Sequence, residues 1–168
     1  MAFDHLAHPS DPQPGWQYEH IKRYLATDGD DGYLWDGVPA RPEPLDPGVP
    51  TLLLTTRGWK SGIARRTPLI FGRDGDRYVV VASKGPSPTH PYWYRNLSAD
   101  PRVRVQIRGE RFDAHARTAT EQERPALWAL MNEIWPDYDL YQSMVSRQIP
   151  VVVLERVDGR TSQDVSGS

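Results

Sequence analysis

The side chains best suited to bind an anion gather in one short turn between two apolar stretches. Residues 52–71 read LLLTTRGWKSGIARRTPLIF, and their hydroxyl and cationic side chains include Thr55, Thr56, Lys60, Ser61, Arg65 and Arg66. Gly58 and Gly62 expose backbone N–H groups, which add further donors. An oxyanion-rich ligand needs this set of donors. A hairpin whose charges are simply solvated is the alternative that the turn alone leaves open.

A second cluster of polar and aromatic residues lies in ASKGPSPTHPYWYRNL, residues 82–97. Ser83 and Lys84 end an apolar run and lead into a proline-rich loop. Trp93 and Asn96 then fall near the start of a short expected helix. The N-terminus of a helix attracts anions, and aromatic rings beside it can flank a planar ligand. Packing of Trp93 or Tyr94 in the core is the alternative.

Three aromatic residues with polar tips recur at helical spacing further along the chain. Trp135, Tyr138 and Tyr141 follow one another at intervals that place them along one side of a helix. Such a stripe is more often core packing than a pocket. Here Asp137 and Asp139 lie between the rings, and full burial of these carboxylates would be costly. We therefore expect the stripe to reach a cleft.

Composition excludes several classes of function. The chain has no cysteine, which removes disulfides, thiolate metal sites and cysteine nucleophiles. No H-E-x-x-H, G-x-S-x-G, Walker A or G-x-G-x-x-G motif occurs, and we expect no metal site. With a formal net charge of -2 the chain lacks the basic field that binds nucleic acid. The start of the chain has no signal-peptide pattern, and no apolar run reaches about 20 residues, so we expect a cytoplasmic protein without an integral membrane segment.

Antiparallel strands are the elements expected to position these clusters. Apolar and alternating runs predict strands over 51–56 and 150–157, and hairpins over 66–83 and 102–119. Helical spacing predicts helices over 15–27, 91–99, 120–135 and 137–147, and Thr120 with Glu123 forms a capping box for the third. About six antiparallel strands with helices at the ends predict an α+β fold built as a small barrel.

The length of 168 residues, of which 38% are hydrophobic, suits a single domain. Residues 1–15 predict a loose N-terminal arm, and residues 16–50 predict a helix followed by a proline- and glycine-rich segment that wraps the core. Residues 51–157 would form the barrel and residues 158–168 a disordered tail. Because the wrapping segment could cover its own barrel or that of a second copy, a monomer and a homodimer both fit the sequence.

In combination and in this order, the three clusters resemble the deazaflavin-dependent nitroreductase family, split β-barrel oxidoreductases that use coenzyme F420. The matching segments are LLLTTRGWKSGIARRTPLIFGRDGDRYVVVASKG, HPYWYRNLSADPRVRVQI and ERPALWALMNEIWPDYDLYQSMVSRQIPVVVLE. The resemblance implies a split, FMN-binding-like barrel. It also implies hydride transfer from reduced deazaflavin to a small aromatic acceptor, a nitro compound or a quinone. A quinone acceptor would bring the protein to the membrane surface.

The resemblance implies a role for most residues of the three clusters. Coenzyme F420 joins a planar deazaflavin ring to a phosphodiester and an oligoglutamate tail, so one end is flat and the other is anionic. The residues whose positions match the cofactor-binding motifs are Lys60, Ser61, Arg65, Arg66, Pro68, Ser83, Lys84, Trp93 and Asn96. Trp135, Tyr138 and Tyr141 match positions that cover the ring and form the substrate pocket. Tyr138 or Tyr141 would donate a hydrogen bond or a proton to the acceptor, which makes both catalytic candidates.

The chain departs from the family pattern at three positions. Trp59 stands where the family commonly carries a cation, and Arg57 replaces a threonine, so one cation has moved two residues upstream. Trp135 stands where relatives can carry tyrosine. We expect this last difference to change substrate preference more than cofactor choice.

Two other functions fit the same barrel. FMN or a tetrapyrrole could take the place of F420, since a fold does not fix its cofactor. FMN needs one phosphate clamp, however, and the cations Lys60, Arg65, Arg66 and Lys84 exceed that need. A non-enzymatic carrier could instead hold a fatty acid among the aromatic residues. Such a carrier would tolerate loss of the cations, whereas the enzyme would not.

Overall fold

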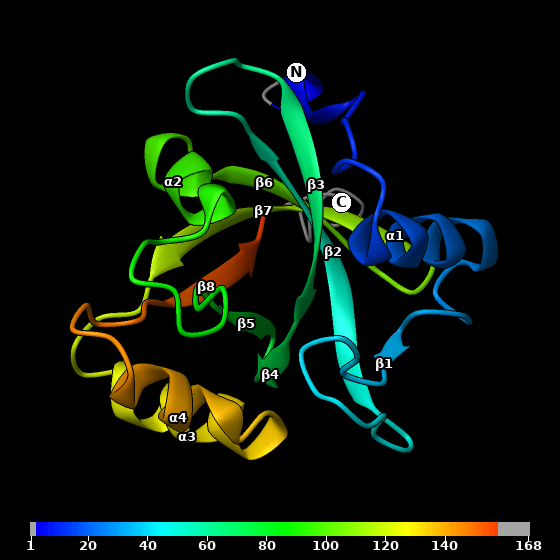
Figure 1. Cartoon of the computed structure of the whole chain (residues 1–168). Coiled ribbons are helices and arrows are strands. Elements are labelled where there is room, and N and C mark those ends of the chain that lie inside the picture. The colour runs from blue at the N-terminus through cyan, green and yellow to red at the C-terminus, as the bar shows by residue number, and fades with distance from the viewer. Residues whose placement is uncertain (1–2, 158–168) are drawn as a thin grey trace.

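The computed structural model describes residues 3–157, so the expected disordered tail over 158–168 lies outside the described residues. One curled sheet forms the body of the molecule, and helices pack at its ends and on its outer face (Figure 1). The strands are β1 (Leu34–Trp35), β2 (Val49–Arg57), β3 (Ala64–Ile70), β4 (Gly72–Asp74), β5 (Arg77–Val81), β6 (Arg102–Ile107), β7 (Glu110–Thr118) and β8 (Val151–Arg156). The helices are a short 3-10 turn (Asp4–Leu6), α1 (Trp16–Thr27), α2 (Tyr92–Ala99), α3 (Arg124–Ile134) and α4 (Asp137–Ser143).

The sheet runs in the order β1-β2-β6-β7-β8-β5-β4, and β3 pairs with β2 beside this path. All of these strand pairs are antiparallel. The predicted hairpins form, with Asp74 opposite Arg77 in one and Ile107 opposite Glu110 in the other. The predicted α+β split β-barrel is confirmed. Between residues 3 and 157, no helix is both long and apolar enough to span a bilayer.

The described residues form eight strands, whereas the sequence predicted about six. One predicted strand divides at Phe71: β3 pairs with β2, and from Gly72 onward the chain pairs with β5 instead. Helix α3 approaches the chain closely at this change of partner, since a Cβ on Gly72 would lie 2.7 Å from Met131 Sδ. The second additional strand, β1, has only two residues and lies within the wrapping segment.

Alternating side chains divide the core of the barrel into two layers. In β8, Val152 and Leu154 belong to the layer inside the barrel, while Val151 and Val153 belong to the layer that packs under α3 and α4. The strand is therefore buried on both faces, which explains why its sequence is one continuous apolar run. Each such side chain contributes roughly 1.5–3 kcal/mol to folding by leaving water.

Helix α1 packs on β2, around a small cluster that includes Leu53. Tyr24 Oη donates a hydrogen bond to Thr51 O at 3.0 Å and accepts one from Arg108 N at 2.8 Å. One phenol therefore ties α1 both to β2 and to the turn between β6 and β7. His20 is buried beside Tyr24, with its Nε2 3.3 Å from Thr51 Oγ1.

Residues 3–15, which we expected to form a loose arm, lie against β2 and β3. The Leu6 side chain is buried. Ser10 N donates to Ala64 O at 2.7 Å, and Ser10 O accepts from Arg66 N at 3.0 Å. Asp11 adds an ion pair to the Arg66 side chain, with 2.8 Å between Oδ1 and Nε. These contacts depend on partners some 55 residues away in sequence, and no period within the segment reveals them.

Helices α3 and α4 lie side by side at one end of the barrel (Figure 1). The predicted capping box precedes α3, since Glu123 N donates to Thr120 Oγ1 at 3.1 Å and Thr120 N donates to Glu123 Oε1 at 2.9 Å. Pro136 follows the end of α3, where its ring and missing N–H prevent the helix from continuing. Trp135, between the two helices, is thereby buried at the junction.

Candidate functional site

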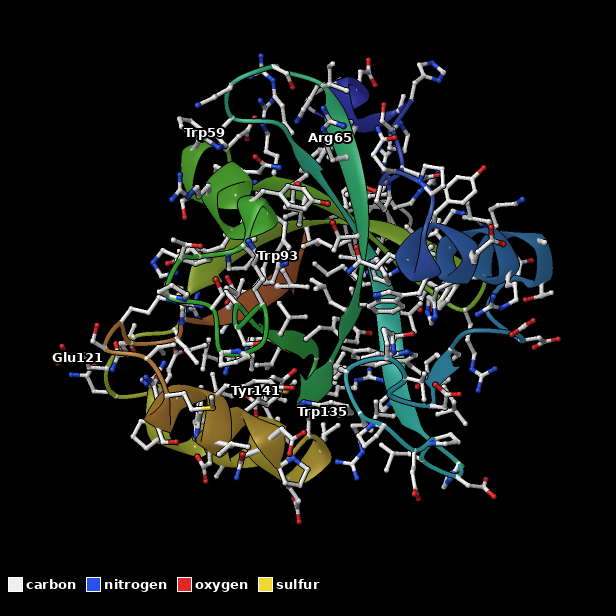
Figure 2. The ribbon with its side chains drawn as sticks, in the orientation of Figure 1. Trp59, Arg65, Trp93, Glu121, Trp135 and Tyr141 are labelled. Carbon is white, nitrogen blue, oxygen red and sulfur yellow. The ribbon has the colours of Figure 1, made fainter. Side chains whose placement is uncertain are left out.

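A cavity of about 300 Å³ opens between β3, the end of β5, α2 and the α3–α4 pair, and we call it the aromatic cleft. The predicted site residues that line it are Pro68, Ser83, Lys84, Trp93, Trp135, Tyr138 and Tyr141. In Figure 2, Trp93 lies near the centre of the molecule, with Trp135 and Tyr141 below it beside the α3–α4 pair. Three segments that are far apart in the sequence therefore meet at one site.

A second cavity, of about 400 Å³, lies at the turn between β2 and β3, and we call it the cationic pocket. The predicted site residues that line it are Lys60, Ser61, Arg65 and Asn96. Tyr92, at the start of α2, lines both this pocket and the aromatic cleft, so the two cavities adjoin. The Tyr92 hydroxyl is fixed there by a hydrogen bond of 2.6 Å to Thr67 Oγ1 of β3.

The glycines of the β2–β3 turn allow the chain to fold tightly around the Ser61 hydroxyl. A Cβ on Gly58 would lie 2.6 Å from Ser61 Oγ, so a side chain at this position would displace the hydroxyl. Ser61 Oγ accepts a hydrogen bond from Ile63 N at 3.0 Å. Gly62 adopts a φ of 76°, a region that favours glycine. The turn is therefore a specific structure that presents Lys60 and the neighbouring backbone to the cationic pocket.

Asn96 has both ends of its amide engaged within the protein. Its Oδ1 accepts from Trp59 N at 3.0 Å, and its Nδ2 donates to Thr56 Oγ1 at 3.0 Å. The side chain is buried. Asn96 therefore joins α2 to the β2–β3 turn. Its amide holds the turn in place and so positions the turn residues that line the cationic pocket.

Lys60 and Arg65 have no ion-pair partner within residues 3–157, whereas most arginines near them do. The Lys60 ammonium lies 4.9 Å from the centre of the Trp59 ring, an attractive contact that leaves its charge uncompensated. Paired cations are the norm elsewhere on this sheet, so two cations facing one pocket indicate an anionic ligand.

Arg66 was predicted to share this site, but the structure does not bring it there. Successive residues of a strand face opposite sides, so Arg66 points away from Arg65 and toward the N-terminal segment. It pairs with Asp11 and lines a separate cavity together with Arg104 and Arg111. The position of a cation in the motif does not reveal which face of β3 it occupies.

Arg57 does not supply the cation that Trp59 displaces. The guanidinium lies 3.9 Å from the carboxylate of Asp100, and Arg57 lines a separate cavity at the turn instead of the cationic pocket. Trp59 itself is 47% exposed and forms part of the wall of the cationic pocket. The indole therefore adds a flat surface at the pocket and a platform for Lys60.

The predicted aromatic stripe does reach the aromatic cleft. Trp135 Nε1 donates to Tyr141 Oη at 3.3 Å, which leaves the hydroxyl proton of Tyr141 available to another acceptor. Tyr138 is buried, and burial, followed by the neighbouring Tyr141, raises its pKa well above the ordinary value. Asp139 is occupied outside the cleft, where its carboxylate accepts one hydrogen bond from Trp128 Nε1 and another from Asn132 Nδ2. In the described residues no group of His, Asp and Glu side chains is arranged to hold a metal ion.

Three stacked indoles form one wall of the cleft, and no pattern in the sequence predicts this stack. Trp35 lies between Trp16 and Trp135, with ring centroids 5.1 Å and 5.4 Å apart and interplanar angles of 6° and 17°. Its Nε1 donates to Val38 O at 3.0 Å. Because the three residues come from α1, β1 and the α3–α4 junction, only the tertiary structure reveals that they meet.

Comparisons with known proteins show the family of the chain. The family described as F420H(2)-dependent quinone reductase matches residues 16–156. An F420H(2)-dependent quinone reductase of Mycobacterium tuberculosis is 40% identical over 140 residues, which cover 82% of this chain and 87% of that protein.

Two solved structures are also similar. One, an F420-H2 dependent reductase, is 42% identical with a TM-score of 0.59 and covers 62% of this chain and 93% of its own. The other, described as a domain-swapped dimer, is 37% identical with a TM-score of 0.59 and covers 82% of this chain and 95% of its own. The predicted resemblance is confirmed, and the chain belongs to the F420H(2)-dependent quinone reductase family, whose members are oxidoreductases that use coenzyme F420.

Proposed function

We propose that the protein transfers hydride from reduced coenzyme F420 to a quinone-type acceptor in the aromatic cleft. One observation carries the proposal: an aromatic cavity and a cationic cavity adjoin at Tyr92, and the two cations of the second have no ionic partner within residues 3–157. Coenzyme F420 has the same division, with a flat ring at one end and phosphate and carboxylate groups at the other. The residues present therefore fit this cofactor.

The two cavities assign different tasks to the predicted cofactor residues. Lys60, Ser61 and Arg65 would hold the phosphate and the tail carboxylates, through charge-assisted hydrogen bonds. The residues that would line the deazaflavin end are Pro68, Ser83, Lys84 and Trp93. Asn96 would act indirectly, because its amide holds the turn. Arg66 has no part in this assignment, since it lies on the other face of β3.

When bound, reduced F420 supplies the hydride, so no protein nucleophile is required. The chain aligns the acceptor and keeps water out of the cleft. Tyr141 would donate its Oη proton or a hydrogen bond to the acceptor oxygen, where negative charge grows. Tyr138 stays protonated over the physiological pH range because burial raises its pKa, so it can donate a hydrogen bond but does not act as a base.

A quinone suits the walls of the aromatic cleft, which present flat indole and phenol surfaces from Trp35, Trp135 and Tyr141. The relatives that share the family are named quinone reductases. A nitro compound remains the second acceptor to compare. Anaerobic oxidation of reduced F420, followed with a soluble quinone and with a nitroaromatic of similar size, gives the order of preference, and we expect the quinone to react faster.

Fluorescence titration tests the cofactor. The six tryptophans report binding, so F420, FMN and a fatty acid can be compared with the wild type and with Lys60→Ala. We expect F420 to bind most tightly, with an affinity that falls about tenfold or more in Lys60→Ala and also falls with rising salt. Lys22→Ala is the matched control, since Lys22 also lies over an aromatic ring, 5.3 Å from the centre of Tyr18, but outside both cavities.

Two outcomes would contradict the proposed cofactor. Tighter binding of FMN than of F420 would favour an FMN protein. Tight binding of the fatty acid that is unaffected by Lys60→Ala would favour a carrier.

We further propose a homodimer, because one similar solved structure is described as a domain-swapped dimer and covers most of this chain. Light scattering coupled to gel filtration gives the mass of the particle directly. A mass near the 19.1 kDa of a single chain would contradict the dimer. The cytoplasmic location of the protein and its action on a quinone at the membrane surface stay predictions.

A further inference from the structure

One guanidinium holds the loop that carries Ser83 and Lys84. Arg147 lies between α4 and β8, outside the lining of the aromatic cleft and of the cationic pocket. Its Nη2 donates to Ser83 O at 2.8 Å, its Nε donates to Ser87 O at 3.0 Å, and its Nη1 donates to Ala82 O at 3.3 Å. All three nitrogens of the side chain therefore donate hydrogen bonds to loop 82–90.

The same loop offers Arg147 a fourth acceptor. Arg147 Nη1 lies 2.9 Å from His90 Nδ1. Burial, and then the charges of Arg147 and Arg95, lower the pKa of His90, so the ring is neutral at pH 7 and its Nδ1 can accept. The planar fork of an arginine can serve several acceptors at once, and it suits this arrangement better than the single point charge of a lysine.

Arg147 is itself anchored to the helix that carries the catalytic candidates. Its carbonyl accepts from Gln142 Nε2 at 2.8 Å, and Gln142 Oε1 accepts from Ile149 N at 2.8 Å. Gln142 belongs to α4, as do Tyr138 and Tyr141. Arg147 thus connects two walls of the aromatic cleft: α4 on one side and loop 82–90 on the other.

The loop needs such a support because Lys84 adopts a conformation that lysine disfavours. Its φ is 54°, in the left-handed region, which a residue with a side chain disfavours. Strained residues of this kind persist where the surroundings fix them. The two carbonyls that Arg147 holds immediately before Lys84 provide this constraint, and the Lys84 side chain is thereby directed to the cleft.

We propose that Arg147 is a positioning residue for Lys84: its fork fixes loop 82–90 so that the Lys84 ammonium faces the deazaflavin end of the cofactor, and Arg147 itself makes no contact with the cofactor. This inference rests on the proposed function of the site. Its consequence is that the effect of Arg147 on F420 affinity passes through Lys84, so the two residues are coupled in cofactor binding.

A double-mutant cycle measures this coupling. F420 affinity is determined by tryptophan quenching for the wild type, Arg147→Lys, Lys84→Ala and the double variant. We expect Lys84→Ala to weaken binding about tenfold and Arg147→Lys to weaken it several-fold. In the Lys84→Ala background, Arg147→Lys should change F420 affinity by less than about twofold, because Arg147 acts on this affinity through the Lys84 side chain, which is then absent.

Hydrogen exchange provides a readout without cofactor. Exchange of the backbone amides in residues 82–90 should speed up in Arg147→Lys and stay at the wild-type rate in Lys84→Ala. Arg117→Lys is the matched control, since Arg117 also uses its guanidinium for several bonds, to Glu123 and Glu155, but lines neither cavity. It should leave both F420 affinity and exchange of this loop unchanged.

The inference is overturned if Arg147→Lys leaves F420 affinity at the wild-type value, or if its effect is the same with and without Lys84. If Arg147→Lys does not fold, His90→Leu replaces it in the cycle, because this change removes one acceptor of the Arg147 guanidinium. The coupling between His90→Leu and Lys84→Ala in F420 affinity should have the same sign and a smaller magnitude. Failure of the proposed function looks different. In that case the wild-type protein does not bind F420 more tightly than FMN or the fatty acid, or Lys60→Ala does not weaken F420 binding, whatever the result of the double-mutant cycle.

Discussion

Arg65 and Arg66 are neighbours in sequence whose charges serve different purposes. Arg65 lines the cationic pocket without an ionic partner in the described chain, and Arg66 pairs with Asp11 on the other face of β3. We therefore predict that Arg65→Ala weakens F420 binding by about tenfold to a hundredfold, the range of a lost charge-assisted hydrogen bond. Arg66→Ala should leave the affinity within about twofold and lower the free energy of unfolding by up to about 1 kcal/mol.

The two variants are compared by F420 titration and by urea unfolding of the same preparations. Each serves as the control for the other, since the substitutions are chemically identical and one residue apart. Equal losses of affinity in both variants would contradict the placement of Arg66 and restore its predicted role at the cofactor tail.

The two tyrosines of α4 differ in the surroundings of their hydroxyl groups. Tyr141 Oη already accepts from Trp135 Nε1 and has its own proton to donate, whereas Tyr138 is buried with a raised pKa. We predict that Tyr141→Phe lowers kcat for quinone reduction about a hundredfold, within the range of general acid catalysis, and that Tyr138→Phe has a smaller effect. F420 affinity should stay near the wild-type value in both. Unchanged turnover in both variants would remove the phenols from the mechanism.

The elements that were predictable from sequence are those whose partners are close in the chain. Both hairpins follow from alternation and from short turns, and the start of α3 follows from the Thr120–Glu123 capping box. The division of β3 from β4 was not predictable, because it depends on where α3 packs over Gly72. The docking of the N-terminal segment on β3 depends in the same way on partners remote in sequence.

Helix α1 is the element whose attachment to the sheet should depend on pH. His20 is buried against β2, and burial, followed by the charge of Arg23, lowers its pKa from 6.5 to about 4. Above pH 6.5 the ring is neutral in both the folded and the unfolded chain. Between pH 6.5 and 4 the unfolded chain takes up a proton that the folded chain does not, so stability falls as the pH falls.

We predict that this group alone lowers the free energy of unfolding by about 1.4 kcal/mol at pH 5.5 and by roughly 3 kcal/mol at pH 4. Urea unfolding at pH 7.5 and 5.5 measures the effect, and His20→Gln is the control. The difference in stability between wild type and His20→Gln should shift by this amount, because other groups titrate alike in both. A difference that does not change with pH would show that His20 titrates normally.

The site lies where segments remote in sequence meet, and the sequence reveals only part of this arrangement. The three clusters could be recognised in order, and their residue types indicated a ligand with one flat part and one anionic part. Which face of a strand each cation occupies, and which remote rings complete the walls, depends on the curl of the sheet. This is why the sequence did not separate Arg66 from Arg65, and why Tyr92 and the stack of Trp16, Trp35 and Trp135 were missed.

Binding across both cavities should stabilise the entire fold, because the ligand joins β3, α2 and the β2–β3 turn in the folded state only. At a free concentration of one hundred times its dissociation constant, F420 should add about 2.7 kcal/mol to the free energy of unfolding. For a domain of this size that raises Tm by roughly 5–10 °C. Lys60→Ala at the same concentration should show about half this shift, since a tenfold weaker affinity leaves about 1.4 kcal/mol. Thermal unfolding followed by near-ultraviolet circular dichroism measures the shifts, and an equal shift with FMN would mean that the cationic pocket does not select the longer, more highly charged cofactor.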